Sequence, residues 1–469
     1  MSLSMIYRKF ISVKKVYIIT FAMCSMILGM NFKAQALEGT ATESVTTYGA
    51  VGNGQFNNAV ALQDAIDGTP SGGVLIVPNG DYVSHAKLVI DKPITLIGQG
   101  FQKTVLNFVN CSGIEITSSN VMIKDIRIYS TATIDDEYTG IKVYNGNQIS
   151  NFKLNNVDIS RFSTGLRIHR LWNFVFKDMS ISFVKKYGIH TTGLSTNNQI
   201  SNSRIVSENL NISNSKGIYF DGSSGFSEGW MINNTLIYGF ETLIHSQAMS
   251  HVYVNNSILD YSGQVGILLE SVNQHTSSGW QINNNYIAVD NGQAGIHDGN
   301  SATQGSSYGN IFSKNKICAY SSMTYGIICD NNSHSNIVSE NLIYKSAQND
   351  IKIINSEGNG YKNIVTNNMC ISNISYNIAA IGLVANNFGS VYYQRSQNYS
   401  KVGKMKITYD ETVPTSGTWK TGDIVWKINP VEQGSSGSKY ILHGWRRLRS
   451  GSSNILNVDW AEMRMLTGN

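Results

Sequence analysis

Two acidic residues and a histidine, Asp221, Glu270 and His245, each close a five-residue segment that recurs along the chain. The three segments read GIYFD, GILLE and ETLIH, and related copies such as GLRIH and GIICD occur elsewhere. A pair of carboxyl groups can cleave a glycosidic bond, because one protonates the leaving oxygen while the other activates water. The three residues are therefore a candidate catalytic group, with Asp221 and Glu270 as the acid–base pair.

The number of repeats between the two acids sets their separation. In an extended strand the side chains alternate between faces, so the third and fifth positions of each segment point outward if the second and fourth point inward. If repeats stack at about 4.8 Å, the backbones of Asp221 and Glu270 lie about 9.6 Å apart, with His245 between them. Side-chain rotamers can bring such a pair into the range of about 6.5–9.5 Å found in inverting glycosidases.

Several residues near the same positions are candidates for binding the substrate. Some occupy third or fifth positions of the segments, Asp298 follows one of them, and two tryptophans stand in the parallel segments FSEGWMINN and TSSGWQINN. The tryptophans could flank a saccharide groove or close a turn over the core. The full set is Tyr219, His297, Asp298, Arg167, His169, Trp230 and Trp280.

Other interpretations of these residues remain open. Outward side chains at the same position of successive repeats could be Asp, Glu and His for solubility alone. The three catalytic candidates could also hold a metal ion, although no metal site is predicted. A uronate lyase or epimerase would need a base beside the sugar carboxylate, for which Arg167 and Lys216 are candidates. A lyase would allow Ca²⁺ as a cofactor, whereas the hydrolase hypothesis requires none.

The elements that must position these residues repeat every 23 to 31 residues. The repeat consists of short stretches of alternating polarity without a helical period, which predicts a β-solenoid. We expect an all-β chain that forms a right-handed parallel β-helix of about ten coils over residues 85–390. The glycine that opens each segment stands at positions 113, 140, 165, 188, 217, 266, 295 and 326.

A polar residue also recurs once in each repeat, before an apolar residue. Asn at a tight turn tolerates left-handed backbone geometry, and its amide can bond its counterpart in the next coil. We therefore expect a ladder of turn residues along the solenoid. The predicted members are Asp125, Asn156, Asp178, Asn209, Asn234, Asn256, Asn284, Asn315, Asn341 and Asn368.

The N-terminal part of the solenoid resembles a known superfamily. Residues 58–67, NAVALQDAID, predict a short amphipathic helix that covers the open end of the β-helix. The segments VTTYGAVGNGQFNNAVALQDAI, GGVLIVPNGDYV and ITLIGQG resemble the first part of pectate-lyase-like proteins, including polygalacturonase-like proteins and phage tail-spike depolymerases. This resemblance implies the fold, whereas hydrolases, lyases, epimerases and plain binders all share it. The NTD, paired DD and GHG motifs of polygalacturonases are missing from the coils.

Residues 1–36 predict a signal peptide. A basic start precedes an apolar run that is short for a membrane span, and Ala34-Gln35-Ala36 matches a signal peptidase site. The rest of the chain contains 31 basic and 31 acidic residues, which does not favour a nucleic-acid partner. We expect a periplasmic or secreted protein without a stable membrane anchor, in which the buried cysteines remain thiols.

Four regions follow from these patterns: the signal peptide (1–36), the cap and first coils (37–110), the β-helix (111–400) and a small C-terminal β module (401–469). The module holds four of the seven tryptophans, for sugar binding, for a small core or for assembly. The resemblance to tail spikes also allows a homotrimer. We expect an exported glycoside hydrolase acting on a bacterial capsular or exopolysaccharide; the alternatives are a uronate lyase or epimerase and a noncatalytic binding or surface-assembly protein.

Overall fold

The structure is a computed structural model of the 469-residue chain. The predicted signal peptide lies outside the described residues. None of the described helices is long and apolar enough to cross a membrane. The structure describes residues 41–131, 137–144, 146–222, 225, 227–247, 249–272, 275–299, 306–330, 333–354, 362–376, 381–393, 400–402 and 405–468.

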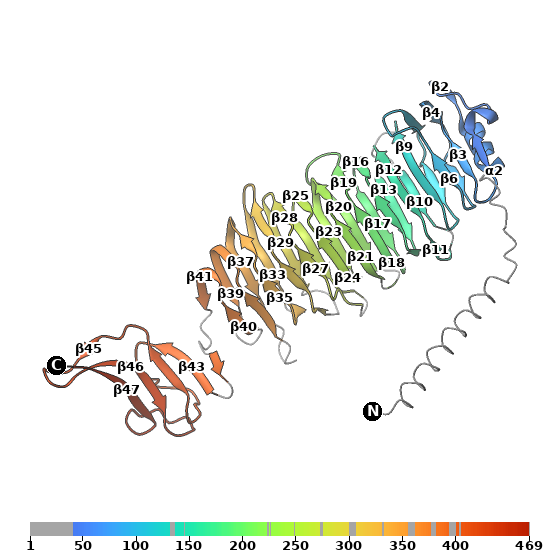
Figure 1. The fold of residues 1–469 in the computed structure, drawn as a ribbon. Helices are drawn as coiled ribbons and strands as arrows, with labels where there is room; N and C mark the ends of the chain where they lie inside the picture. Colours follow the sequence, from blue (N-terminus) through green and yellow to red (C-terminus); the bar gives the residue numbers. More distant parts are fainter. Residues whose placement is uncertain are drawn as a thin grey trace, which may run out of the picture.

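A single sheet of 39 strands, from β1 (Thr42–Ser44) to β41 (Phe388–Tyr393), winds along the molecule as a parallel β-helix of about 11 coils (Figure 1). One coil contains β26 (Val265–Glu270), β27 (Gln281–Asn283) and β28 (Tyr286–Val289). Each of these strands pairs in parallel with the equivalent strand of the next coil. The predicted β-helix is confirmed, with about one coil more than expected.

The strands therefore form three parallel faces. We call the face that carries the recurring glycines the glycine sheet, the face that follows it the second sheet, and the remaining face the third sheet. The strands of the glycine sheet that carry the candidate site are β13 (Thr164–His169), β17 (Tyr187–Thr192), β20 (Ile212–Asp221), β23 (Phe240–Gln247), β26, β29 (Gly292–Asp298) and β33 (Met323–Cys329).

Close contact between coils explains the recurring glycine. A Cβ atom added at Gly266 would lie 2.4 Å from the carbonyl oxygen of Gly295 and 2.6 Å from Cγ2 of Ile287. At Gly188 the corresponding distances, to Gly217 and Ile205, are 2.5 and 2.2 Å. Both lie well inside van der Waals contact, so any side chain at this position would push the coils apart.

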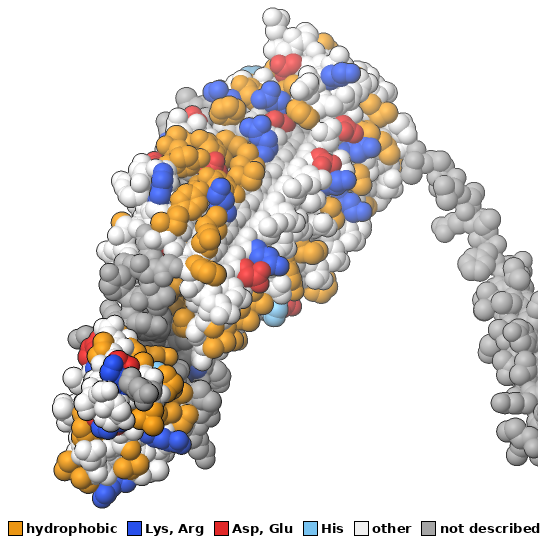
Figure 2. Space-filling view, turned by 60° about the vertical axis from the view of Figure 1, so that its left-hand side comes forward, with side chains coloured by type: hydrophobic (Ala, Val, Ile, Leu, Met, Phe, Trp, Pro, Cys, Tyr) orange, Lys and Arg blue, Asp and Glu red, His pale blue; other side chains and the backbone are white. Residues whose placement is uncertain are grey.

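Turns with left-handed residues separate the second and third sheets. Asn284 (φ 57°) donates from Nδ2 to Oδ1 of Asn256 at 2.6 Å, and Asn234 donates to Asn202 at 2.9 Å. Figure 2 shows the stripe of side chains that are neither charged nor hydrophobic along the β-helix. The left-handed residues at these turns are Asp125, Asn156, Asp178, Asn202, Asn234, Asn256, Asn284, Lys314, Glu340, Asn367 and Asn386.

The predicted ladder was wrong in four coils. Asn202 occupies the turn that was assigned to Asn209. In three later coils the turn residue is Lys314, Glu340 or Asn367, and the predicted asparagine is the next residue. Those asparagines form an inner, buried ladder: Asn315 donates from Nδ2 to Oδ1 of Asn341 at 3.0 Å. The sequence pattern found the ladder but not which of two adjacent polar residues makes the turn.

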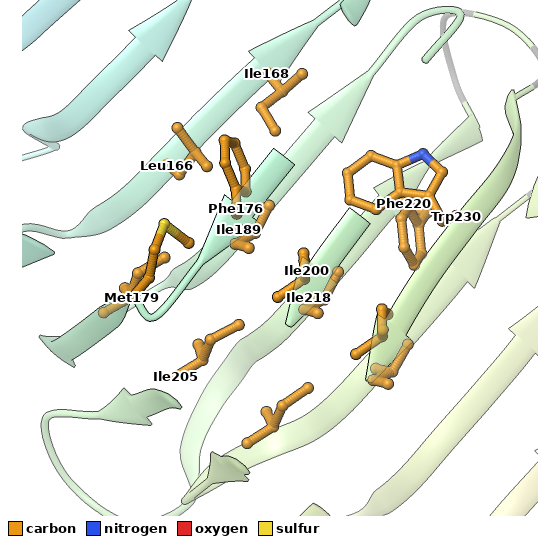
Figure 3. Packing of buried hydrophobic residues seen from close by; sticks show 14 of the residues in the cluster. Leu166, Ile168, Phe176, Met179, Ile189, Ile200, Ile205, Ile218, Phe220 and Trp230 are labelled. Atoms are coloured by element: carbon orange, nitrogen blue, oxygen red, sulfur yellow. The ribbon is translucent and has the colours of Figure 1, made fainter. Parts of the chain in front are cut away.

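The interior is filled by apolar residues from all three faces. Figure 3 shows Leu166, Ile189 and Ile218 stacked in successive coils, with Phe220 and Trp230 in contact nearby. The Phe220 and Trp230 rings meet edge to face at 4.9 Å, and both residues are almost inaccessible to solvent. This continuous core supplies the rigid frame that holds the outward side chains in register.

A helix covers the N-terminal end of the core. Helix α2 (Ala59–Gly68) buries Leu62, Ala65 and Ile66 against the first coils, which confirms the predicted cap. Asn58 precedes the helix, but its amide bonds Val51 and Phe56 instead of capping the helix. Its role is to fix the preceding loop.

The C-terminal module is a six-stranded sheet that includes β43 (Met405–Asp410), β44 (Ile424–Lys427), β46 (Lys439–Arg447) and β47 (Trp460–Gly468). Trp419, Trp445 and Trp460 form its core with Val425 and Leu442. Of the roles considered for these three tryptophans, burial in a small core is the one observed. The described cysteines, Cys111, Cys318, Cys329 and Cys370, are free thiols, and the last three are buried.

Candidate active site

Three histidine–carboxylate pairs lie along the outer surface of the glycine sheet. In each pair the histidine Nε2 approaches a carboxylate oxygen of the next coil, and the three pairs follow one another at intervals of two coils. The histidine side chains are about nine-tenths buried, and the acid side chains are slightly more exposed. The pairs are His190–Asp221 at 3.2 Å, His245–Glu270 at 2.7 Å and His297–Asp330 at 3.4 Å.

The pairs arise from two adjacent columns of outward residues. Third positions of successive segments align along the sheet, and so do fifth positions. The third column contains Arg167, His190, Tyr219, His245, Leu268 and His297. The fifth column contains His169, Thr192, Asp221, Gln247, Glu270, Gly299 and Asp330. Four third-column residues therefore contact the fifth-column residue of the following coil: His190, Tyr219, His245 and His297.

His245 lies in the third column and not in the fifth, where it was predicted. The segment ETLIH was aligned with Glu241 at the glycine position, which placed Leu243 outward. Leu243 instead aligns with the recurring glycines and is fully buried, so the segment is LIHSQ. His245 therefore does not stand between Asp221 and Glu270; Gln247 does.

Asp221 and Glu270 lie two coils apart in the fifth column, which corresponds to about 9.6 Å between their backbones. Gln247 donates from Nε2 to Oε2 of Glu270 at 3.3 Å and accepts from the hydroxyl of Tyr219 at 2.7 Å. Glu270 Oε2 thus receives contacts from both His245 and Gln247. Hydrogen bonds donated to a carboxylate stabilise its ionised form.

Burial determines the protonation of His245. Its burial lowers the pKa of the imidazole, although Glu270 acts in the opposite direction. The Nδ1 atom is buried without a hydrogen-bond partner, so a proton there would be an unsatisfied buried donor. We therefore assign the neutral tautomer, in which Nε2–H donates to Glu270 and orients it.

Aromatic rings stack along the third column beside these acids. His190 and Tyr219 are parallel with ring centroids 5.1 Å apart, and His245 follows at 5.0 Å from Tyr219. The ammonium group of Lys216 lies 4.8 Å from the centre of the Tyr219 ring. Burial lowers the pKa of Lys216 and raises the pKa of Tyr219. The stack fixes the two columns and brings a cation to the site.

Two other predicted binding residues flank the N-terminal end of this stack. Arg167 is exposed in the third column, directly beside His190. His169 lies in the fifth column, and its Nδ1 bonds the hydroxyl of Thr192 at 2.9 Å. Its pKa is lowered by burial and by the nearby arginines. These residues lie on the same surface as Asp221.

Three predicted binding residues are buried instead. Trp230 and Trp280 are fully inaccessible, and their indole N–H groups donate to the carbonyl oxygens of Ser195 and Met249. They therefore cannot stack on a sugar. Asp298 points inward, where burial raises its pKa to about 6. It accepts hydrogen bonds from Ser307, Ser333, Asn310 and Asn336.

Three residues of the site were not among the predicted site residues: Gln247, Asp330 and His190. Histidine at every second coil is visible only when the register of LIHSQ is correct, because His245 then joins His190 and His297 in one column. Among the residues that the structure describes, no three His, Cys, Asp or Glu side chains gather closely enough to hold a metal ion.

Comparison with known proteins places this surface in a broader context. Residues 43–297, more than half of the chain, match the family described as rhamnogalacturonase A/epimerase, pectate lyase-like. The tail spike protein of Shigella phage Sf6 is 22% identical in an alignment of 270 residues, which covers 53% of this chain and 42% of the tail spike. The chain thus spans about two fifths of that relative.

A solved structure shows the same fold at low identity. The DFA-IIIase from Arthrobacter chlorophenolicus A6 without its lid superposes with a TM-score of 0.50 and 14% identity, covering 75% of this chain and 99% of the enzyme. The A-module of a mannuronan C-5 epimerase from Azotobacter vinelandii gives a TM-score of 0.45 and 15% identity, covering 75% of this chain and 94% of the module.

Proposed function

Because the chain belongs to the rhamnogalacturonase A/epimerase, pectate lyase-like family, a family of polysaccharide-active β-helix proteins, we propose that it is a glycoside hydrolase. Its substrate would be a bacterial capsular or exopolysaccharide. One observation carries the proposal: Asp221 and Glu270 stand two coils apart in one column, and each is held by a histidine of the preceding coil. Their separation of about 9.6 Å between backbones suits an inverting mechanism.

The surroundings of the two acids differ and suggest their roles. Glu270 contacts both His245 and Gln247, which favours its ionised form, and we assign it as the general base. Asp221 is more exposed, at 18% against 11%, so the leaving oxygen of a bound polysaccharide can reach it, and it would act as the general acid. Glu270 removes a proton from water, whose oxygen forms a bond to the anomeric carbon. The glycosidic bond breaks as Asp221 transfers its proton to the leaving oxygen.

The test combines substrates and variants. Residues 37–469 would be incubated with a panel of bacterial polysaccharides, and new reducing ends would be counted for wild type, Asp221→Asn and Glu270→Gln. We expect each variant to lose about 10²- to 10⁴-fold in kcat, the usual contribution of an acid or base. Glu115→Gln, which removes a carboxylate from the same sheet near its N-terminal end, should retain activity.

A synthetic substrate separates the two roles. An aryl glycoside of the cleaved sugar with a good leaving group needs little protonation, so it should restore activity to Asp221→Asn but not to Glu270→Gln. Full activity of either variant on the natural polysaccharide would refute the proposed pair.

A uronate lyase or epimerase is the second candidate, supported by the contact between Lys216 and Tyr219. The lowered pKa of Lys216 increases the fraction of neutral amine that could remove a proton from a uronate, and Arg167 could face the carboxylate. Absorbance from unsaturated uronates, abolished by Lys216→Met, would favour elimination. Binding without any product would favour a noncatalytic polysaccharide-binding or surface-assembly protein.

Export and assembly are separate proposals. We propose that residues 1–36 are removed during export to the periplasm or the medium; the N-terminal sequence of the secreted protein tests this. We also propose a homotrimer, supported by exposed apolar side chains on strands of the third sheet, among them Ile258 at 49%, Met369 at 54% and Phe388 at 69% exposure. Figure 2 shows hydrophobic patches on one face of the β-helix. Light scattering that gives the mass of a monomer would refute the trimer.

A further inference from the structure

The proposed acid–base pair leaves one of the three histidine–carboxylate pairs without a role. His297 and Asp330 repeat the geometry of His245 and Glu270, displaced by two coils towards the C-terminus. No requirement of the β-helix explains this copy, because Leu268 occupies the same third column without such a pair. The recurrence of the histidine–carboxylate pair along the β-helix points to a ligand that itself extends along the axis.

We propose that the His297–Asp330 pair is a substrate-binding subsite, which holds a sugar unit of the chain next to the one that is cleaved. The inference rests on the proposed function and adds the direction of the substrate: the polysaccharide lies parallel to the axis of the β-helix. Asp221, Glu270 and Asp330 share the fifth column at intervals of two coils, so they span about 19 Å. An extended polysaccharide of several sugar units matches a straight row of this length.

The polar groups of the row suit hydroxyl-bearing sugars. The histidine side chains are about nine-tenths buried, whereas the side chains of Asp221, Glu270 and Asp330 remain exposed by 18, 11 and 14%. Each histidine holds its acid in place and leaves part of the carboxylate open to a hydroxyl donor. Three such acids at two-coil spacing therefore favour a ligand with hydroxyl groups at a regular interval.

Between the second and third histidine–carboxylate pairs, an apolar residue faces outward. Leu268 is partly exposed in the third column, and the fifth-column residue of the next coil is Gly299, which has no side chain to form a polar pair with it. A pyranose ring has an apolar face and a rim of hydroxyl groups. Its face would lie over Leu268 while the rim meets the pairs at Glu270 and Asp330.

The experiment compares Asp330→Asn and His297→Gln with wild type and with Glu115→Gln. We expect KM for long polysaccharide to rise about tenfold in the first two variants while kcat stays within twofold, because a hydrogen bond to a charged group is lost only in binding. Short oligosaccharides that do not reach Asp330 should be cleaved equally by all four proteins, and the product sizes from long chains should change only in the first two.

Three outcomes are informative. An unchanged KM and product pattern in Asp330→Asn, with the fold intact by circular dichroism, would overturn the subsite while leaving the acid–base pair untouched. A fall in kcat at constant KM would also overturn it and would place Asp330 in the chemistry. If wild type cleaves nothing, the proposed function fails; weaker binding of Asp330→Asn to the polysaccharide in affinity electrophoresis would still support the subsite, and equal binding would refute it.

Discussion

The recurring glycine of the glycine sheet should not tolerate even alanine. Gly266 is the clearest position, because an added Cβ would lie 2.4 Å from the Gly295 carbonyl oxygen. Ordinary contact begins near 3.4 Å, so the two coils must separate locally by about 1 Å. Overpacking of this kind costs about 1–3 kcal/mol. Alanine also reduces the entropy of the unfolded chain, which offsets about 0.4–1 kcal/mol.

The net expectation for Gly266→Ala is a loss of about 1–2 kcal/mol in the free energy of unfolding, measured by urea denaturation. Gln264→Ala, two residues earlier with an exposed side chain, is the control and should stay within about 0.5 kcal/mol of wild type. Because Gly266 lies in the strand that carries Glu270, activity should fall as well. A variant as stable as the control would refute the explanation of the repeat by coil contact.

Two further predictions concern buried residues. Since burial raises the pKa of Asp298 to about 6, its contribution to stability is complete below the unfolded pKa near 4 and is lost as the pH rises through 6. Asp298→Asn should remove this slope between about pH 4 and 6 in urea titrations and cost about 1–3 kcal/mol; an unchanged slope would contradict the assignment. Trp280→Ala should lower the free energy of unfolding by about 3–5 kcal/mol, because the ring is fully buried. Trp280→Phe should retain polysaccharide binding, and a selective loss of binding would contradict the core assignment.

The fold was predictable because its signal is repeated. Gly-apolar-x-apolar segments and turn asparagines recur in almost every coil, so the other repeats still identify the fold when one repeat is misaligned. The cap was also predictable, since the apolar residues of 59–68 follow a helical pattern and Asn58 precedes them. Both inferences depend only on local pattern and on the need to bury apolar surface.

The candidate site was harder to predict because it depends on register. The outward face of His245 follows from alternation, but a shift by two residues preserves that face while changing the column. The glycine that fixes the register elsewhere is replaced by Leu243, whose side chain is buried. The same limit applies to Lys314 and Asn315, where two adjacent polar residues compete for one turn.

Burial of single residues was the other source of error. Trp230 and Asp298 stand beside outward positions in the sequence, and each has chemistry that suits sugar binding. Their true environment depends on residues distant in the sequence: Trp230 packs against Phe220, and donors from its own coil and from the next coil surround Asp298. A single sequence does not show such contacts, because they form only when the coils stack.

Strands of the β-helix pair only with strands of adjacent coils, and this has a consequence for folding. Tyr219 pairs with His190 on one side and with His245 on the other, and each partner is only one coil away in the sequence. Every β contact is therefore formed between segments that are synthesised close together in time, so the contact order is low for a β protein. A chain that emerges from a pore with its N-terminus first could form the cap with α2 and then add one coil after another. Each completed coil would serve as the template for the next, and no coil would have to wait for the C-terminus.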